Sequence, residues 1–190
     1  MPPDLYIPID AVWIAVWAVW LVCAAGTKRA VEKQPFGTRV FHLILVVTAF
    51  LLVFRSEYGL GPLGWRFVPA SYAVAYAGLA LTVAGAGFAI WARLTLGRNW
   101  SAAVTIKEDH RLIQTGPYAM MRHPIYSGFL LALLGTALAV GEVRCLVGLV
   151  LAFAAWWTKS RLEEPFMERQ FGAEYIAYKQ RVKALIPLVL

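Results

Sequence analysis

Five apolar runs dominate the pattern of hydrophobic and polar positions along this chain. Three of them, residues 9–25, 40–54 and 68–91, are long and nearly free of charge, as membrane-spanning helices are. Two shorter runs, 125–140 and 145–157, are separated by only four residues and predict a helical hairpin. Because a span needs about 20 residues, we expect flanking residues or a locally thinner bilayer to help these two cross. The pattern predicts an all-α integral membrane protein with about five transmembrane helices.

Small residues recur within the third run. Gly78, Thr82 and Ala86 follow one another at intervals of four residues. Side chains at this spacing lie on one face of a helix, and small ones let two backbones approach closely in a membrane. We therefore expect this face to pack against another helix.

Composition supports a lipid environment. Hydrophobic residues make up 60% of the chain and charged residues 15%, whereas soluble domains are about 45–50% apolar and about 25% charged.

The two cysteines, Cys23 and Cys145, lie inside apolar runs without metal-ligand spacing, so we expect neither a disulfide nor a metal site. The first basic residue follows the first run, which favours a retained anchor over a cleaved signal peptide.

The distribution of basic residues predicts the orientation in the membrane. The formal net charge is +7, and fifteen of the 18 Lys and Arg residues lie in segments 26–39, 92–124 and 158–190. Cytoplasmic connections of membrane proteins carry such an excess. We therefore expect an N-terminus outside and a C-terminus in the cytoplasm, in the inner membrane if the source is bacterial. Charge spread along one membrane face, with no nucleic-acid-binding motif, indicates the lipid bilayer as partner and excludes nucleic acid.

Polar residues gather in one cytoplasmic segment, LGRNWSAAVTIKEDHRLIQTGPYAMMRHPIYSG, residues 96–128. Pro124 is suited to open the next helix, because its missing N–H costs nothing at the first helical position. His123 is then expected at the membrane surface, at a helix N-terminus that favours a carboxylate or another anion. An interfacial basic anchor before a helix-starting proline explains the same residues without a ligand.

Two adjacent carboxylates, Glu163 and Glu164, follow the fifth run. Close to a membrane boundary, such a pair costs desolvation free energy unless it meets cations or a cationic ligand. A solvated helix with local Lys and Arg partners is the alternative. Beyond the pair, apolar positions at helical spacing predict an amphipathic C-terminal helix along the interface, with Phe166, Phe171, Tyr175, Tyr178 and Val182 on one face.

The order GRNWS, HRLIQTGPY, RHPIYSG, apolar hairpin, EE and FGAEYIAYKQRVKALIP closely resembles the isoprenylcysteine carboxyl methyltransferase family, whose wider relatives include the phospholipid N-methyltransferases. The resemblance covers residues 91–188. It implies a membrane enzyme that uses S-adenosylmethionine, with a cytoplasmic cofactor pocket. It also divides the chain into an N-terminal three-helix membrane region, 1–90, and a methyltransferase-like catalytic region, 91–190.

The resemblance further implies roles for individual residues. Nine positions match motifs that form or border the family's cofactor pocket: His110, Leu112, Gly116, Tyr118, His123, Pro124, Tyr126, Gly128 and Glu164. Glu163, Arg161 and Arg181 are the expected catalytic residues, the two arginines meeting the substrate carboxylate. Glutamates suit the positive sulfonium of the cofactor, and a helix N-terminus suits its carboxylate.

The nature of the acceptor follows from its chemistry. A carboxylate is ionised at neutral pH and needs alignment more than proton removal, whereas an amine must first lose a proton. With arginines at hand, we favour a lipophilic, isoprenylcysteine-like carboxylate, and phospholipid or amine N-methylation is the alternative. A membrane sterol-type reductase resembles the pattern too. It would use NADPH, with these residues as phosphate ligands: Arg93, Arg98, Lys107 and Arg111.

Overall fold

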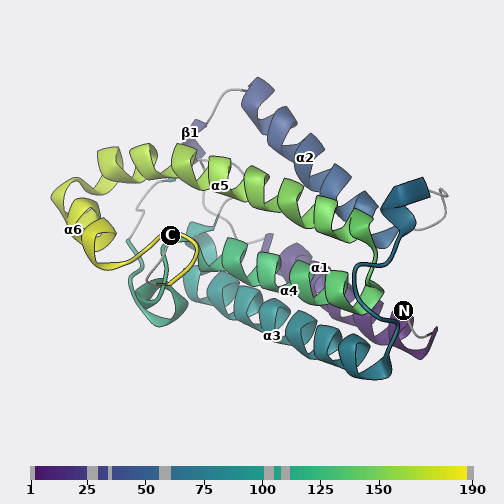
Figure 1. The fold of residues 1–190 in the computed structure, drawn as a ribbon. Helices are drawn as coiled ribbons and strands as arrows, with labels where there is room; N and C mark the ends of the chain where they lie inside the picture. The colour runs from purple at the N-terminus through teal and green to yellow at the C-terminus, as the bar shows by residue number, and fades with distance from the viewer. Residues whose placement is uncertain are drawn as a thin grey trace.

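The computed structural model describes residues 3–24, 30–33, 36–55, 61–100, 105–107 and 112–187. Within these ranges the chain forms an elongated bundle of α-helices (Figure 1): α1 Tyr6–Ala24, α2 Phe36–Phe54, α3 Tyr72–Leu96, α4 Pro124–Val140, α5 Val143–Phe171 and α6 Ala173–Arg181. By length and composition, α1, α2, α3 and α5 are able to cross a membrane, and α4 is a shorter apolar helix. The predicted all-α integral membrane fold is confirmed.

The bounds of α5 and α6 correct two expectations. The second helix of the hairpin is not short: α5 has 29 residues, or about 43 Å, against a hydrocarbon core of about 30 Å. Its last turns therefore extend past the core and carry Glu163 and Glu164 with them. The predicted amphipathic helix is not continuous, because Gly172, with φ +53°, separates α5 from α6 in a backbone region that favours glycine.

Helices α3 and α4 lie side by side, and α4 lies between α3 and α5 (Figure 1). A Cβ added to Gly78 would lie 2.6 Å from the carbonyl oxygen of Gly135, so the two backbones touch where glycines meet. At the same interface the Thr82 and Thr136 hydroxyls lie 3.3 Å apart, and the Trp13 indole N–H of α1 donates to Thr136 at 3.1 Å. The predicted packing face of α3 is confirmed, since Gly78 and Thr82 belong to it.

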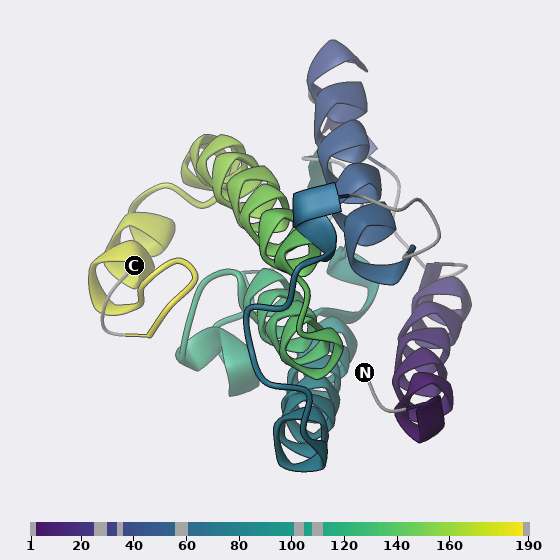
Figure 2. The same ribbon diagram turned by 45° about the vertical axis from the view of Figure 1, so that its right-hand side comes forward.

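The remaining long helix, α2, packs against α5. The His42 ring on α2 is hydrogen-bonded to the Thr158 hydroxyl on α5 at 3.1 Å. At the other end, Arg144 donates to the carbonyl oxygens of Leu52 and Val53, which are acceptors left over at the end of α2. Figure 2 shows α1 and α6 on opposite sides of the bundle.

Short elements complete the described part of the chain. Four 3-10 helices are η1 Pro3–Leu5, η2 Gly61–Gly64, η3 Gly97–Asn99 and η4 Gly116–Ala119. An antiparallel pair of strands, β1 Ala30–Lys33 and β2 Thr105–Lys107, was not expected from the sequence. The boundary expected after residue 90 falls inside α3, so both regions share the α3–α4 interface.

Candidate active site

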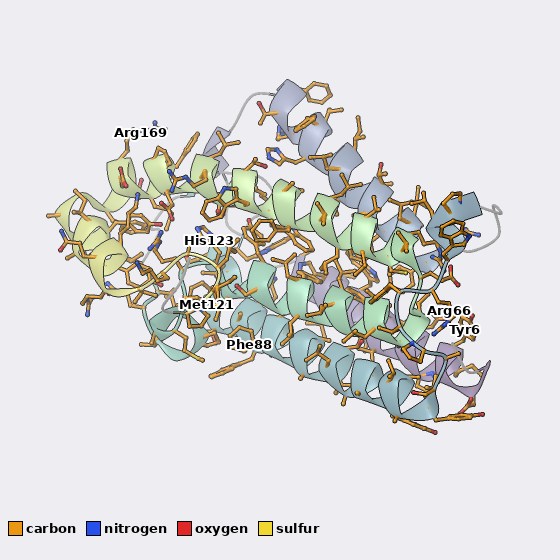
Figure 3. The ribbon with its side chains drawn as sticks, in the orientation of Figure 1. Tyr6, Arg66, Phe88, Met121, His123 and Arg169 are labelled. Carbon is orange, nitrogen blue, oxygen red and sulfur yellow. The ribbon has the colours of Figure 1, made fainter. Side chains whose placement is uncertain are left out.

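The candidate site lies at one end of the bundle. There the start of α4, the last turns of α5, α6 and the segment after α6 come together (Figure 1). His123 lies at this end, whereas Arg66 and Tyr6 lie at the opposite one (Figure 3). Residues about 40 to 60 positions apart in the sequence therefore face one another here.

Glu164 is the centre of a buried ion-pair cluster. Its side chain is 3% exposed, and its Oε1 accepts hydrogen bonds from Arg122 Nε at 3.0 Å and Nη2 at 2.5 Å. Lys179 Nζ lies 2.9 Å from Glu164 Oε2 and 2.9 Å from Glu168 Oε1. A buried carboxylate is costly without such partners. Cations from before α4 and from α6 thus neutralise a carboxylate on α5.

Glu163 occupies a different environment. The Tyr126 hydroxyl donates to its Oε1 at 2.7 Å, and His123 Nδ1 lies 3.3 Å from its Oε2. Its side chain is 19% exposed, several times more than that of Glu164. The adjacent carboxylates therefore differ: one is enclosed by cations, and the other is partly open.

The His123 ring lies between the two glutamates. Its Nε2 is 3.7 Å from Glu164 Oε1, and this buried atom has no hydrogen-bond partner among the described residues. Burial lowers the pKa of His123, but its interactions with Glu163 and Glu164 outweigh that effect and raise the pKa above its ordinary value. The imidazole is therefore held in its charged form more strongly than a free histidine is.

Aromatic rings form a wall beside this cluster. The His123 and Tyr126 rings stack with centroids 5.5 Å apart, and Tyr126 stacks in turn on Trp156 at 6.1 Å. Phe129 continues the wall, at 5.5 Å from Trp156, and Lys159 Nζ lies 5.4 Å from the Tyr126 ring. Flat apolar faces next to charged groups suit a ligand that carries both a planar or hydrocarbon part and charges.

The segment after α6 fixes the start of α4. The backbone N–H groups of Arg122 and His123 donate to the carbonyl oxygens of Lys183 and Ala184 at 2.8 and 2.9 Å. The Ser127 hydroxyl donates to the carbonyl oxygen of Leu185 at 2.5 Å. Arg122 Nη1 also donates to the carbonyl oxygen of Val182. The C-terminal segment thus holds in place the residues that meet the glutamates.

The structure brings together some of the residues expected from the resemblance. His123 contacts Glu163, Glu164 and Tyr126, and Tyr126 contacts Glu163. Pro124 is the first residue of α4, as predicted. The start of α4 was expected beside a carboxylate or another anion, and it lies beside the carboxylates of Glu163 and Glu164.

Three further motif positions lie on η4 or just before it. Tyr118 on η4 is buried, and its backbone oxygen accepts from the Tyr178 hydroxyl at 2.5 Å. Burial and the charge of Glu163 raise the pKa of Tyr118, while Arg93 acts in the opposite direction. Gly116 packs against the end of α3, and Leu112 is half-buried.

Other expected residues are placed differently. Gly128 faces α3, where a Cβ would lie 2.6 Å from the backbone nitrogen of Ala89, so its position is set by packing. Arg161 is exposed, with its guanidinium 5.6 Å from the Trp157 ring. Arg181 is exposed and donates to Gln114 Oε1 at 2.9 Å. His110 lies outside the described residues.

Two cations of the cluster were missed by sequence reasoning. Arg122 and Lys179 neutralise Glu164, yet neither was among the expected site residues. Arg122 directly precedes His123 in the RHP motif. This position next to a predicted site residue could have indicated Arg122 as a partner of the glutamates. Lys179 lies in α6, and the sequence holds no local sign that this helix folds back onto α5.

Comparison with known proteins identifies the family. Residues 73–174, more than half of the chain, match the phospholipid methyltransferase family. The chain is 34% identical over 119 residues to a probable protein-S-isoprenylcysteine O-methyltransferase of Oryza sativa subsp. japonica, covering 61% of this chain and 62% of that protein. It is 38% identical over 100 residues to the protein-S-isoprenylcysteine O-methyltransferase of Saccharomyces cerevisiae, covering 50% and 41%.

A solved structure shares the fold. It is the eukaryotic intramembrane Ras methyltransferase ICMT, which superposes with a TM-score of 0.59 and 26% identity over 79% of this chain and 53% of that one. The chain thus spans less than two thirds of the length of these relatives. The matched residues include the start of α4 and both glutamates. As the resemblance predicted, the chain belongs to the phospholipid methyltransferase family, with isoprenylcysteine O-methyltransferases among its relatives.

Proposed function

We propose that this chain is a membrane methyltransferase that uses S-adenosylmethionine to form a methyl ester on a lipophilic, isoprenylcysteine-like carboxylate. The observation that carries the proposal is the buried contact of His123 with Glu163 and Glu164 inside the family-matched segment. The plant and yeast relatives are named for O-methylation of isoprenylcysteine, which supports the choice of acceptor.

The donor set fits S-adenosylmethionine. When bound, this cofactor supplies an electrophilic methyl group on a positively charged sulfur. Glu163 is the partly open carboxylate and suits that positive charge. His123 Nε2, which has no hydrogen-bond partner among the described residues, suits a carboxylate when the ring is protonated. The stacked faces of Tyr126 and Trp156 suit a purine.

The residues of the cluster divide the remaining work. Tyr126 and His123 fix the orientation of the Glu163 carboxylate by hydrogen bonding. Arg122 and Lys179 neutralise Glu164, so this second carboxylate holds the elements together. Buried aromatic residues exclude water, which strengthens electrostatic interactions and protects a bound electrophile from hydrolysis.

A carboxylate acceptor agrees with these contacts better than an amine. Deprotonating an ammonium needs a general base. Glu163 is an unsuitable base, because Tyr126 donates to it and His123 lies beside it, and both favour its ionised form. N-methylation of a phospholipid amine is the second candidate, since the matched family is named for phospholipid methyl transfer.

We also propose that the site faces the cytoplasm. Basic residues concentrate at the site end of α5 and in α6, and the positive-inside rule places such residues in the cytoplasm. On this orientation the C-terminus is inside and the N-terminus outside.

A transfer assay tests the proposal. Detergent-purified protein is incubated with radiolabelled S-adenosylmethionine and either N-acetyl-S-farnesylcysteine or phosphatidylethanolamine vesicles. We expect base-labile label, released as methanol, on the farnesylated acid alone. Base-stable label on the phospholipid would establish the amine alternative. Calorimetric titration with S-adenosylhomocysteine and NADPH separates a methyltransferase from a reductase: binding of NADPH alone would overturn the proposal.

The Glu163→Gln variant tests the cluster itself. We expect it to weaken S-adenosylhomocysteine binding at least tenfold, or about 1.4 kcal/mol. Glu168→Gln is the matched control on the same helix and should bind normally, because the Glu168 carboxylate is paired with Lys179 and not with His123 or Tyr126. Equal affinities of the two variants would remove Glu163 from the cofactor site.

A further inference from the structure

Arg93 is a buried cation at the end of α3 that the proposed site does not use. The residue is 1% exposed. Its Nη1 donates to the carbonyl oxygen of Gly97 and its Nη2 to that of Cys23, both at 2.8 Å. Its guanidinium lies 4.6 Å from the Trp100 ring, and its Nε is buried without a hydrogen-bond partner in the described part of the chain. The Arg93 side chain is therefore fixed in place, but one of its N–H donors has no hydrogen-bond acceptor among the described residues.

The other well-buried arginines show what Arg93 lacks. The Arg122 side chain, 7% exposed, pairs with Glu164, and that of Arg144, 4% exposed, pairs with Glu142. No carboxylate among the described residues is paired with Arg93. Burying a charge without a counter-charge is costly, and carbonyl dipoles at helix ends offset only part of that cost. The arrangement therefore favours an anion that the described part of the chain does not provide.

Aromatic contacts lead from Arg93 to the candidate active site. Trp100, which lies under the guanidinium, contacts Trp20 with ring centroids 6.5 Å apart, and Trp20 contacts Phe129 at 5.0 Å. Phe129 stacks on Trp156, a member of the aromatic wall beside Glu163. A hydrocarbon ligand in contact with these rings would thus connect the buried cation with the cluster.

Electrostatics links the same two places. Besides burial, the charge of Glu163 raises the pKa of the Tyr118 hydroxyl, and the charge of Arg93 lowers it. Gly116, two residues earlier on η4, packs against Trp91 and Thr95 on the two sides of Arg93 in the sequence. The end of α3 is therefore next to the motif segment that leads into the site.

We propose that Arg93 binds the carboxylate of the lipophilic acceptor. This inference rests on the proposed carboxyl methylation and names the group that holds its substrate. Arg161 and Arg181, expected in this role from the resemblance, are exposed, and Arg181 is hydrogen-bonded to Gln114. Two guanidinium nitrogens of Arg93 already donate to backbone carbonyl oxygens. Arg93 therefore has fewer N–H groups left for a carboxylate than an arginine without such hydrogen bonds. It therefore positions the carboxylate without quenching its nucleophilicity.

Asn99, in η3 directly after α3, holds a second buried polar atom. Its Oδ1 is buried and has no hydrogen-bond partner within the described ranges. An unpartnered acceptor close in sequence to an unpartnered donor fits a ligand that presents a carboxylate and an N–H together. An N-acylated amino acid, such as the C-terminal residue of a lipidated peptide, has both groups.

The test compares two ligands that differ in charge alone. Inhibition by S-farnesylthioacetic acid and by its carboxamide is measured for the wild type, Arg93→Gln and the control Arg98→Gln, an exposed arginine of the same segment. We expect the wild type and the control to bind the acid at least about tenfold more tightly. The preference should fall below about threefold in Arg93→Gln, because a neutral amide cannot form a charged hydrogen bond with the acid.

Further measurements separate this role from a structural one. S-adenosylhomocysteine affinity should change less than about twofold in Arg93→Gln, because the cofactor cluster is intact. If that variant does not fold, Arg93→Lys keeps the charge but not the fork, and should weaken acid binding about tenfold without affecting the carboxamide. A retained acid preference in either variant overturns the assignment. Loss of the preference in Arg161→Gln or Arg181→Gln instead also overturns it. Failure of the wild type to methylate any acid would refute the proposed function itself.

Discussion

The Glu164→Gln substitution offers a stringent test of the ion-pair cluster. Glutamine has the same shape but carries no charge, so Arg122 and Lys179 lose their shared buried counter-ion. Removing one partner of a buried pair costs about 3–5 kcal/mol. Arg122 keeps its carbonyl acceptors, and Lys179, 38% exposed, keeps Glu168. These remaining contacts place the expected loss at the lower end, about 3 kcal/mol.

The assay is thermal unfolding in detergent, followed by tryptophan fluorescence. In a chain of this length each kcal/mol shifts Tm by about 2–4 °C, so Glu164→Gln should lower Tm by about 6–12 °C. Glu168→Gln is the matched control, with the same chemistry, the same helix and the same lysine, but a carboxylate that is 38% exposed. An exposed pair contributes about 0–1 kcal/mol, so its shift should not exceed about 4 °C.

Two outcomes would refute this reasoning. A Glu164→Gln shift no larger than that of Glu168→Gln would show that burial does not strengthen the pair. A large shift with unchanged S-adenosylhomocysteine affinity, measured below both transitions, would show that Glu164 only stabilises the fold. We expect instead an affinity loss of at least tenfold, or about 1.4 kcal/mol, because Glu164 fixes Arg122 and, through it, the start of α4.

Two further predictions concern packing and pH. Gly128→Ala should lower Tm, because its Cβ would meet the Ala89 backbone at 2.6 Å and overpacking costs about 1–3 kcal/mol. The control Gly87→Ala should be neutral or stabilising, because nothing lies within 4 Å of the added Cβ. Equal Tm shifts of the two variants would contradict the close approach of α3 and α4. The pKa of His123 is raised in the fold, so its contribution to stability is complete at low pH and is lost as pH rises through the raised value. The Tm advantage of the wild type over His123→Gln should therefore shrink as the pH rises above about 6.5, the ordinary pKa of histidine, and a growing advantage would contradict the raised pKa.

The sequence predicted most of the fold, because a membrane helix can be recognised from its own run of apolar residues. Continuous apolar runs marked all five long helices, and the first position of α4 followed from the backbone chemistry of Pro124. The end of α5 was missed, because its last turns leave the apolar run at Trp157 while the helix continues to Phe171. The break at Gly172 was missed because the apolar spacing carries through it, and only the backbone conformation shows the interruption.

The candidate site was predictable in its residues but not in their pairing. The resemblance selected His123, Tyr126, Glu163 and Glu164, and these do meet. It did not indicate which cation would neutralise which glutamate, since that depends on α6 folding back onto α5. Arg161, close to the glutamates in sequence, is exposed, whereas the partner of Glu164 at hydrogen-bond distance comes from 42 positions away.

The two glutamates differ because of helix geometry. Adjacent side chains on a helix point about 100° apart, so one position faces the cations of α6 and of the segment before α4, and the other faces Tyr126. Glu164 thereby becomes a buried counter-ion that ties three segments together, while Glu163 keeps an exposed edge. His123 touches both, so the histidine that leads into α4 couples the stabilising carboxylate to the one available for a cationic ligand. A single glutamate would have to fill both roles, and a buried, fully paired carboxylate has no charge left to offer a ligand.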